Sequence, residues 1–133
     1  MATFRFELVS PEKLLFSGEV EQVVVPGSEG EFTVLAGHAP FMSSLKAGVV
    51  FIEESAGHGR RMMVLGGFAD VSSKGLSILA ERASPLEDVS LEQMDQEIIH
   101  AQTMREALTT NAERDVADTK IAQMKELRAV LAR

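Results

Sequence analysis

The fold class can be inferred from residues 26–50, which read PGSEGEFTVLAGHAPFMSSLKAGVV. Gly27, Gly30, Gly37 and Gly48 separate short apolar runs in this stretch, and no helix-forming segment follows any of those runs. A glycine-rich phosphate-binding loop has to open onto a helix whose first N–H groups point at the anion. We therefore expect these glycines to serve β-turns and not to hold a nucleotide phosphate.

The same pattern of short apolar runs and turn residues extends from Phe4 to Ala80. Turn chemistry recurs about every 6 to 12 residues with no helical period between the turns, which is typical of an antiparallel sandwich or barrel. We predict an antiparallel β-sandwich over residues 1–84. The predicted turns are Ser10–Pro11, Ser17–Gly18, Pro26–Gly27, residues 37–40, Ala47–Gly48, residues 57–59, Gly66–Gly67 and Lys74–Gly75.

The alternation of apolar and charged residues predicts which strands expose one face to solvent. Phe4, Phe6 and Leu8 alternate with charged residues, so the first strand is expected to bury one face only. The segments Val23–Val25 and Met62–Leu65 are apolar at every position. We expect such strands to be buried twice, once in the core and once against a partner or the C-terminal segment.

The composition changes at Ser84–Pro85. No glycine or proline follows through Arg133, and alanine, leucine, glutamate and glutamine dominate, which predicts helix over residues 85–133. Ser90 and Gln93 have the spacing of a capping box, with Leu91 opening the first helix. The apolar stripe of this helix consists of Leu91, Met94, Ile98, Ala101 and Leu108.

A second helix is predicted to begin after a short break at residues 109–111, with Asn111 as its N-cap, and to end at about Leu131. Its apolar stripe consists of Ala117, Ile121, Met124, Leu127 and Leu131. So short a break implies an antiparallel hairpin. Residues 88–106 carry five acids and one base (−4), and residues 119–133 carry four bases and one acid (+3), so the two helices should attract each other. The predicted fold class is α+β, mostly β.

Composition excludes several functional classes. The chain has 133 residues and a net charge of −7, which argues against nucleic acid and anionic lipid as partners. It contains no cysteine, so disulfides, thiolate metal sites and cysteine nucleophiles are ruled out. No apolar run reaches the ~18 residues of a membrane span, and Arg5 and Glu7 interrupt the apolar stretch that a signal peptide would need. We expect a cytosolic protein, soluble or peripheral to a membrane.

No catalytic or metal-binding constellation is apparent. The histidines His38, His58 and His100 lack the spacing that places two imidazoles on one metal ion. Ser17 and Ser43 have neither a nearby histidine nor a nucleophile elbow. We therefore expect no metal, no cofactor and no independent enzymatic activity. For His38, in a turn stiffened by a proline two residues later, turn capping and partner contact both remain open.

The chain resembles the epsilon subunit of bacterial F-type ATP synthases. The resemblance is strong over residues 1 to about 83, and over residues 86–133 it concerns mainly length and helical character. The blocks that carry it are residues 6–10 (FELVS), 16–18 (FSG), 27–31 (GSEGE), 37–40 (GHAP), Leu45–Lys46 and Gly66–Gly67. The resemblance implies a non-catalytic rotor subunit on the cytoplasmic face of the bacterial inner membrane, attached only through its complex.

The resemblance also implies partners and contact residues. The sandwich would join the gamma subunit to the membrane rotor ring, the c-ring. Glu29, Gly30 and Glu31 match the family's ring contact. The positions matching gamma contacts are Ser10, His38, Ser43 and Leu65.

A regulatory role is implied for the helical hairpin. In the family it lies against the sandwich or extends along gamma into the alpha/beta catalytic head, where it blocks ATP hydrolysis. The candidate inhibitory cations here are Lys120, Lys125, Arg128 and Arg133. Pairing of these cations with the acidic first helix is the alternative.

Some members bind ATP through an Asp-x-x-Arg-Ala motif at the start of the first helix. Glu92 can stand for the acid of that motif, but Asp95 occupies its arginine position. This reverses the charge where a phosphate needs a cation, which argues against an ATP site.

Two other classes of function are alternatives. A ligand-binding sandwich with a helical lid would need a concave apolar pocket, and the chain offers no Trp or Tyr to build an aromatic platform. A scaffold that oligomerises through its helices would need a self-associating hairpin, whereas these stripes are short, alanine-rich and matched in charge within one chain.

Overall fold

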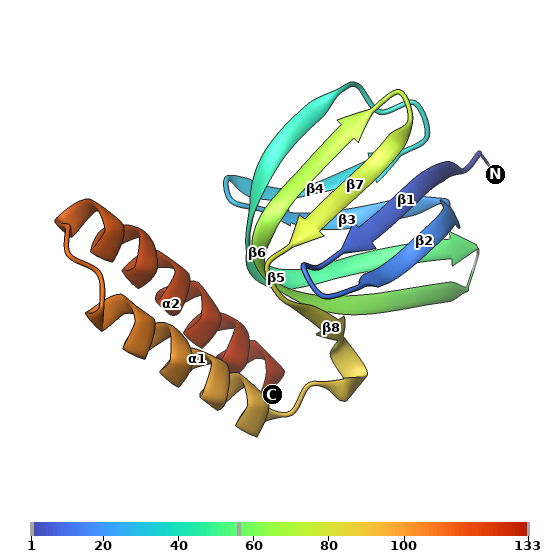
Figure 1. The fold of residues 1–133 in the computed structure, drawn as a ribbon. Helices are drawn as coiled ribbons and strands as arrows, with labels where there is room; N and C mark the ends of the chain where they lie inside the picture. The colour runs from blue at the N-terminus through green and yellow to red at the C-terminus, as the bar shows by residue number, and fades with distance from the viewer. Residues whose placement is uncertain (1, 56, 133) are drawn as a thin grey trace. The chain divides into compact units, whose positions relative to one another are not determined.

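The computed structural model describes residues 2–55 and 57–132. Contacts divide the chain into two compact units, Met1–Glu87 and Asp88–Arg133, of which the first is a β-domain and the second a helical hairpin (Figure 1). The strands are β1 (Phe4–Val9), β2 (Leu14–Val20), β3 (Gln22–Gly27), β4 (Gly30–Leu35), β5 (Phe41–Ser55), β6 (His58–Ser72), β7 (Gly75–Ala80) and β8 (Ala83–Pro85). The helices are the 3-10 helix η1 (Leu86–Asp88), α1 (Leu91–Glu106) and α2 (Asn111–Leu131). The predicted α+β class is confirmed.

The strands form one sheet in the order β2-β1-β7-β6-β5-β3-β4, with β8 pairing β6 beside this path. Every neighbouring pair is antiparallel except β1 and β7, which run parallel with Phe6 opposite Leu76. The predicted antiparallel arrangement therefore holds for every pair but this one. The chain travels through β2 to β6 before β7 returns beside β1, and so long a crossover permits a parallel pairing.

Two of the predicted turns are bends inside long strands. Ala47–Gly48 lies within β5 and Gly66–Gly67 within β6, and the pairing keeps its register from Leu45 opposite Gly67 to Ala47 opposite Leu65. Figure 1 shows both strands curving through the domain. Gly67 has a φ of +134°, and a Cβ there would lie 2.1 Å from the carbonyl oxygen of Leu79. The glycine is therefore needed for close strand approach in a bend, and not for a chain reversal. The turn predicted at Ser17–Gly18 also lies inside a strand, β2.

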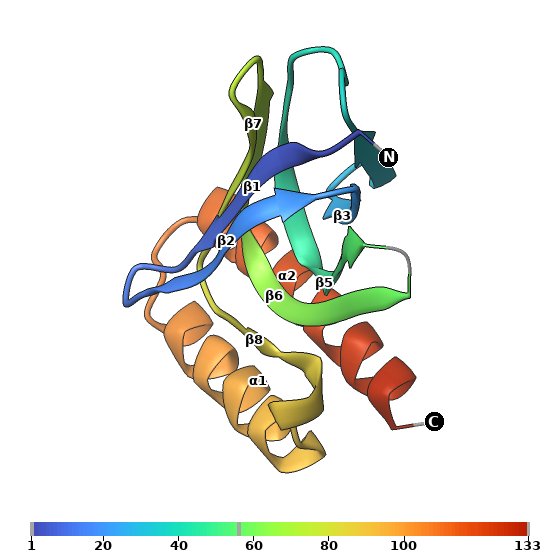
Figure 2. The same ribbon diagram turned by 90° about the vertical axis from the view of Figure 1, so that its right-hand side faces the viewer.

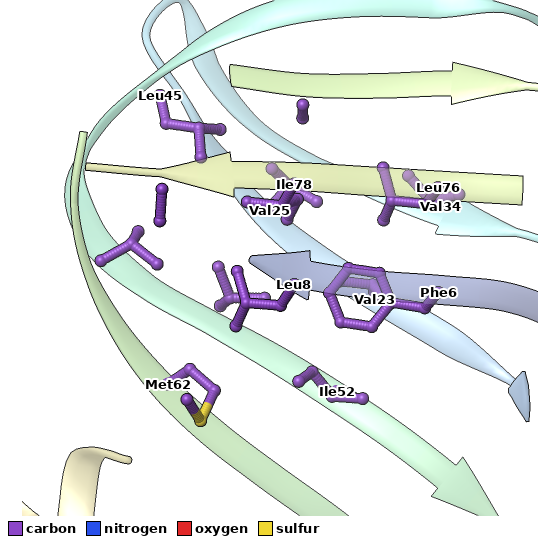
Figure 3. Close-up of a cluster of buried hydrophobic side chains, with 14 of the residues drawn as sticks. Phe6, Leu8, Val23, Val25, Val34, Leu45, Ile52, Met62, Leu76 and Ile78 are labelled. Atoms are coloured by element: carbon purple, nitrogen blue, oxygen red, sulfur yellow. The ribbon is translucent and has the colours of Figure 1, made fainter. Parts of the chain in front are cut away.

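One apolar core fills the β-domain. Phe6 and Leu8 of β1 are fully buried between exposed or half-buried neighbours, which confirms the predicted alternation. They lie with Val23 and Val25 of β3 and Ile78 of β7 in a single cluster (Figure 3). Burial of each such side chain contributes roughly 1.5–3 kcal/mol, so this cluster dominates the stability of the β-domain.

The segment Met62–Leu65 is buried at every position. Met62 and Val64 belong to the core cluster, and Met63 and Leu65, which alternate with them along β6, are only 6% and 2% exposed. The prediction that this strand is buried on both faces is therefore confirmed. In the other doubly apolar segment, Val24 is half-buried.

The two helices lie antiparallel and side by side (Figures 1 and 2). Ser90 caps α1 as predicted: its hydroxyl accepts from the Gln93 N–H at 3.1 Å, and the Gln93 side chain accepts from the Ser90 N–H at 3.1 Å. The predicted cap of α2 is wrong, because Thr110 and not Asn111 is the N-cap. The Thr110 hydroxyl accepts from the Glu113 N–H at 3.1 Å and donates to its carboxylate at 2.8 Å, so Thr110 has the capping partner. None of the described helices is long and apolar enough to cross a membrane.

Candidate functional site

An apolar row crosses the outer face of the β-domain. Phe68 of β6 lies opposite Leu79 of β7, Leu79 opposite Val9 of β1, and Val9 opposite Leu14 of β2. Val9 is half-buried, whereas Phe68, Leu79 and Leu14 are 58%, 55% and 58% exposed. Contiguous exposed apolar side chains on a small protein mark a surface for a partner. We call these four residues the apolar row.

The next row on the same face is mainly polar, which delimits the apolar row. Along the same strands it consists of Met42, Asp70, Ser77, Glu7 and Ser17. Met42, 68% exposed, lies diagonal to Phe68 and continues the apolar surface onto β5. The apolar contact surface is thus a band with a polar border.

A second exposed apolar group surrounds the loop between β4 and β5. Leu35 and Phe41 are 52% and 47% exposed, and the Phe41 ring packs edge-on against Phe32 with 5.1 Å between centroids. His38 lies 6.5 Å from the Phe41 ring, and its Nδ1 donates to the Ala39 carbonyl at 2.6 Å. We call Leu35, His38 and Phe41 the loop cluster. The histidine is held in place by the chain, and it also borders exposed apolar surface.

The predicted gamma-contact residues fall in different environments. His38 belongs to the loop cluster, and Ser43 lies in β5, two residues after Phe41, with its hydroxyl donating to the Ser44 carbonyl at 2.8 Å. Ser10 closes the turn after β1, where its N–H donates to the Lys13 carbonyl at 2.9 Å, next to the end of the apolar row. Leu65 is 2% exposed and does not reach the surface with the others.

The predicted ring-contact residues form an exposed turn between β3 and β4. Glu29 lies in the turn, Gly30 and Glu31 begin β4, and all three are exposed. Ser28 fixes the turn to β5, because its N–H donates to the Ser44 carbonyl at 2.8 Å and its hydroxyl lies 2.6 Å from the Ser44 hydroxyl. The acidic tip is therefore held in a defined position.

Two bidentate ion pairs join α1 to α2. Arg128 donates to Asp95 at 2.8 and 3.3 Å, and Arg105 donates to Asp118 at 2.9 and 3.2 Å. The hydrogen bond from Arg128 lowers the pKa of Asp95, and the same bond raises the pKa of Arg128. The hydrogen bond to Asp118 likewise raises the pKa of Arg105. The attraction predicted between the helices is therefore present. In one pair the acid lies on α1 and the base on α2, and in the other pair the acid lies on α2 and the base on α1.

The four predicted inhibitory cations differ in what surrounds them. Arg128 is engaged by Asp95, Lys120 is half-buried, Lys125 is exposed, and Arg133 lies outside the described residues. At the predicted nucleotide position, Glu92 is exposed in the first turn of α1. Within residues 2–55 and 57–132, no three His, Asp or Glu side chains gather in a way that could hold a metal ion.

Sequence reasoning named His38 as a candidate contact but missed the apolar row and the exposed apolar residues Leu35 and Phe41 beside that histidine. Their signal is present but weak: Ile78 and Leu79 are consecutive apolar residues in a strand, as are Phe68 and Ala69. Which member of each pair faces outward depends on the register of β6, β7 and β1, which a single sequence does not give.

Sequence comparison places the chain among known proteins. It matches the family model described as ATP synthase, Delta/Epsilon chain, beta-sandwich domain over residues 3–86. The ATP synthase epsilon chain of Parvibaculum lavamentivorans is 45% identical over 123 residues, covering 92% of this chain and 93% of that protein. The ATP synthase epsilon chain of Brucella canis is 40% identical over 128 residues, covering 96% and 95%. The similarity therefore includes the helical hairpin as well as the β-domain.

Solved structures give the same likeness at the level of the fold. A chain in the mitochondrial ATP synthase of Euglena gracilis, solved as OSCP, F1 and c-ring, matches 98% of this chain and 82% of its own length, with a TM-score of 0.73 and 26% identity. A chain in the central stalk and c-ring of the Tetrahymena thermophila mitochondrial ATP synthase covers 96% and 97%, with a TM-score of 0.67. At 14% identity the second likeness concerns the fold alone.

Proposed function

This chain belongs to the ATP synthase delta/epsilon-chain family, and we propose that it acts in the central stalk of a rotary ATP synthase as a non-catalytic subunit. Its β-domain joins the gamma subunit to the c-ring, and its helices regulate ATP hydrolysis. The site of action is the cytoplasmic face of the bacterial inner membrane. Such a subunit needs a fixed shape and surfaces for partners, and it needs no catalytic constellation.

The apolar row is the observation that carries the gamma contact. Phe68, Leu79 and Leu14 are each more than half exposed, and covering apolar surface contributes roughly 25 cal/mol per Å². Met42 continues this row onto β5, and Phe41 of the loop cluster directly precedes it in the chain, so we assign His38 to the same contact. An apolar contact that spans several strands suits a subunit that has to transmit torque without sliding against gamma.

Ser10 and Ser43 lie at the borders of this surface and would complete it with polar contacts. Leu65 is buried and would contribute by supporting the backbone of β6, whose N–H at this residue donates to the Arg82 carbonyl at 2.9 Å. The gamma contact proposed here therefore rests on the exposed residues and not on Leu65.

The acidic turn of Glu29, Gly30 and Glu31 is the proposed contact with the c-ring. Its exposure leaves the carboxylates available to polar groups of a ring loop, and its attachment through Ser28 to Ser44 of β5 keeps it from moving independently of the β-domain. A contact that transmits force needs such an anchored tip.

We propose that the helices regulate ATP hydrolysis by exchanging the partners of their charged side chains. Lys125 is exposed, and Arg128 is held by Asp95 of α1 in a pair with both side chains partly exposed. Exposed pairs are worth only ~0.2–1 kcal/mol, so acidic loops of an alpha/beta head could compete for these cations. We place transient contact with that head on α2.

Binding to a gamma subunit tests the proposal. Replacing Phe68 and Leu79 together by serine removes the centre of the apolar row, and we expect the affinity for gamma to fall by about tenfold or more per residue. Val116→Ser is the matched control, because Val116 is 72% exposed and lies on α2. Equal affinity of the double variant and the control would contradict the proposed gamma surface.

Removal of residues 86–133 tests the regulatory half separately. In a reconstituted enzyme we expect truncation to raise ATP hydrolysis while ATP synthesis driven by a proton gradient is retained. Unchanged hydrolysis would contradict the regulatory role and leave the coupling role standing.

A further inference from the structure

One end of the β-domain contains a hollow of about 490 Å³. Its walls are residues 3–5 at the start of β1, residues 34–40 between β4 and β5, and residues 71–75 between β6 and β7. Figure 1 shows the loop after β4, the turn after β6 and the beginning of the chain on the same side of the β-domain. Gly75 brings two of these walls together, because a Cβ at this residue would lie 2.1 Å from the Arg5 carbonyl oxygen. The hollow is therefore part of the folded domain.

The charge of this hollow is opposite to that of the chain. Its fifteen lining residues include three basic side chains, Arg5, His38 and Lys74, and no acidic one, although the chain has a net charge of −7. Arg5 is partly neutralised, because it donates to the Ser17 hydroxyl and lies 3.7 Å from the Glu7 carboxylate. In the described part of the chain, the Lys74 ammonium has no carboxylate within 4.0 Å. Lys74 is therefore the cation most available to a ligand.

His38 can assist Lys74. Its Nδ1 donates to the Ala39 carbonyl, which fixes the imidazole and leaves Nε2 as the second nitrogen. Once protonated, Nε2 can donate to an oxygen anion. The hydroxyl-bearing residues Ser72 and Ser73 line the same hollow. These groups together suit a carboxylate.

The hollow adjoins exposed apolar surface, which identifies the kind of occupant. Leu35 both lines the hollow and belongs to the loop cluster, and Phe41 follows the lining residue Pro40 directly. A small free anion would satisfy the cations but leave Leu35 and Phe41 in water. A protein segment with an acidic side chain beside apolar ones would cover both, which is the pattern of charge complementarity at a protein interface.

We infer that the partner segment that covers Leu35 and Phe41 places an aspartate or glutamate in this hollow, against Lys74 and His38. The inference rests on the proposed function, since the partner is the gamma subunit of the stalk. Once the segment excludes water, the charge pair is stronger than the same pair on an open surface. The charge pair in the hollow thus fixes the position of the partner along the contact, while the apolar row contributes the burial of apolar surface.

Zero-length carbodiimide cross-linking of the full chain bound to gamma tests the inference directly. This reagent joins an amine to a carboxylate only where the two are in contact. We expect mass spectrometry to find Lys74 joined to an aspartate or glutamate of gamma. A complex that forms while Lys74 stays unlinked to gamma would overturn the inference and leave the proposed function intact. Failure of gamma to bind at all would overturn both.

Affinity measurements provide the second test. We expect Lys74→Met to weaken gamma binding roughly tenfold at low salt and to reduce its salt dependence, with Lys74→Arg restoring most of the affinity. Arg61→Met is the matched control, because it removes one positive charge from an exposed position of β6 outside the proposed contact surfaces. Lys74 lies in an exposed turn, so the variants should fold normally, and thermal unfolding checks this. Equal effects of Lys74→Met and Arg61→Met would overturn the inference.

Discussion

The β-domain and the helical hairpin are held together in different ways. In the β-domain, sixteen buried apolar residues form one cluster. In the hairpin five apolar residues are buried, and the ion pairs Asp95–Arg128 and Arg105–Asp118 add bidentate contacts at partly exposed positions. Apolar packing fits one arrangement of neighbours, whereas exposed charges can change partners at little cost in free energy. The difference suits a domain that transmits torque and a hairpin that responds to its surroundings.

The largest expected effect is loss of the core of the β-domain. Phe6→Ala should lower the free energy of unfolding by about 3–5 kcal/mol, because the ring is fully buried and its removal leaves a cavity. Phe68→Ala, on the outer face, should change it by less than about 1 kcal/mol. Urea unfolding followed by far-ultraviolet circular dichroism measures both, since the chain has no Trp or Tyr for fluorescence. Similar losses would show that the two phenylalanines do not differ in burial as described.

A second comparison separates Gly67 and Gly18, two of the glycines that lie inside strands where turns were predicted. Gly67→Ala should destabilise the β-domain by about 3 kcal/mol, because its φ of +134° is strained for alanine and the new Cβ would meet the Leu79 carbonyl at 2.1 Å. Gly18→Ala should cost less than about 1 kcal/mol, because the nearest atom to its added Cβ is 3.7 Å away in the Phe16 ring. The same unfolding experiment applies. Equal losses would mean that the bend in β6 does not depend on Gly67.

These glycines show what the sequence alone does not predict. A glycine pair between two apolar runs predicts that the backbone departs from ideal strand geometry, and it does so at Gly66–Gly67. Whether the departure reverses the chain or bends one strand depends on pairing with β5 and β7, which are distant in sequence. The parallel pairing of β1 with β7 and the outward direction of Phe68 depend on long-range register in the same way. Local signals, such as the capping box at Ser90, predicted the structure correctly.

The start of α2 allows a smaller test within the hairpin. Thr110→Ala should destabilise the helix by about 1 kcal/mol, since it removes the hydroxyl that accepts from the Glu113 N–H. Asn111→Ala should be neutral or slightly stabilising, because this residue is inside the helix, where alanine is favoured. The helical circular dichroism signal during thermal unfolding measures the difference. The reverse order of effects would restore Asn111 as the cap, which sequence alone had suggested because asparagine is among the best capping residues.

The smallest effect is expected at the ion pair between Asp95 and Arg128. The pKa of Asp95 is lowered in the folded hairpin, so the stability that the pair contributes is fully present above the usual carboxyl value of 3.8. It is lost as the pH falls through the lowered value, because a protonated Asp95 no longer attracts Arg128, which keeps its charge since its own pKa is raised. Asp95→Asn should therefore melt at a lower temperature than the wild type near neutral pH and at the same temperature in strong acid. Glu126→Gln, which removes an exposed carboxylate from α2, should not reproduce this convergence. If wild type and Asp95→Asn kept the same melting temperature across the whole range, the Asp95–Arg128 pair would contribute nothing to holding the helices together. Exchange of charge partners could then not be the means by which the hairpin responds to the catalytic head.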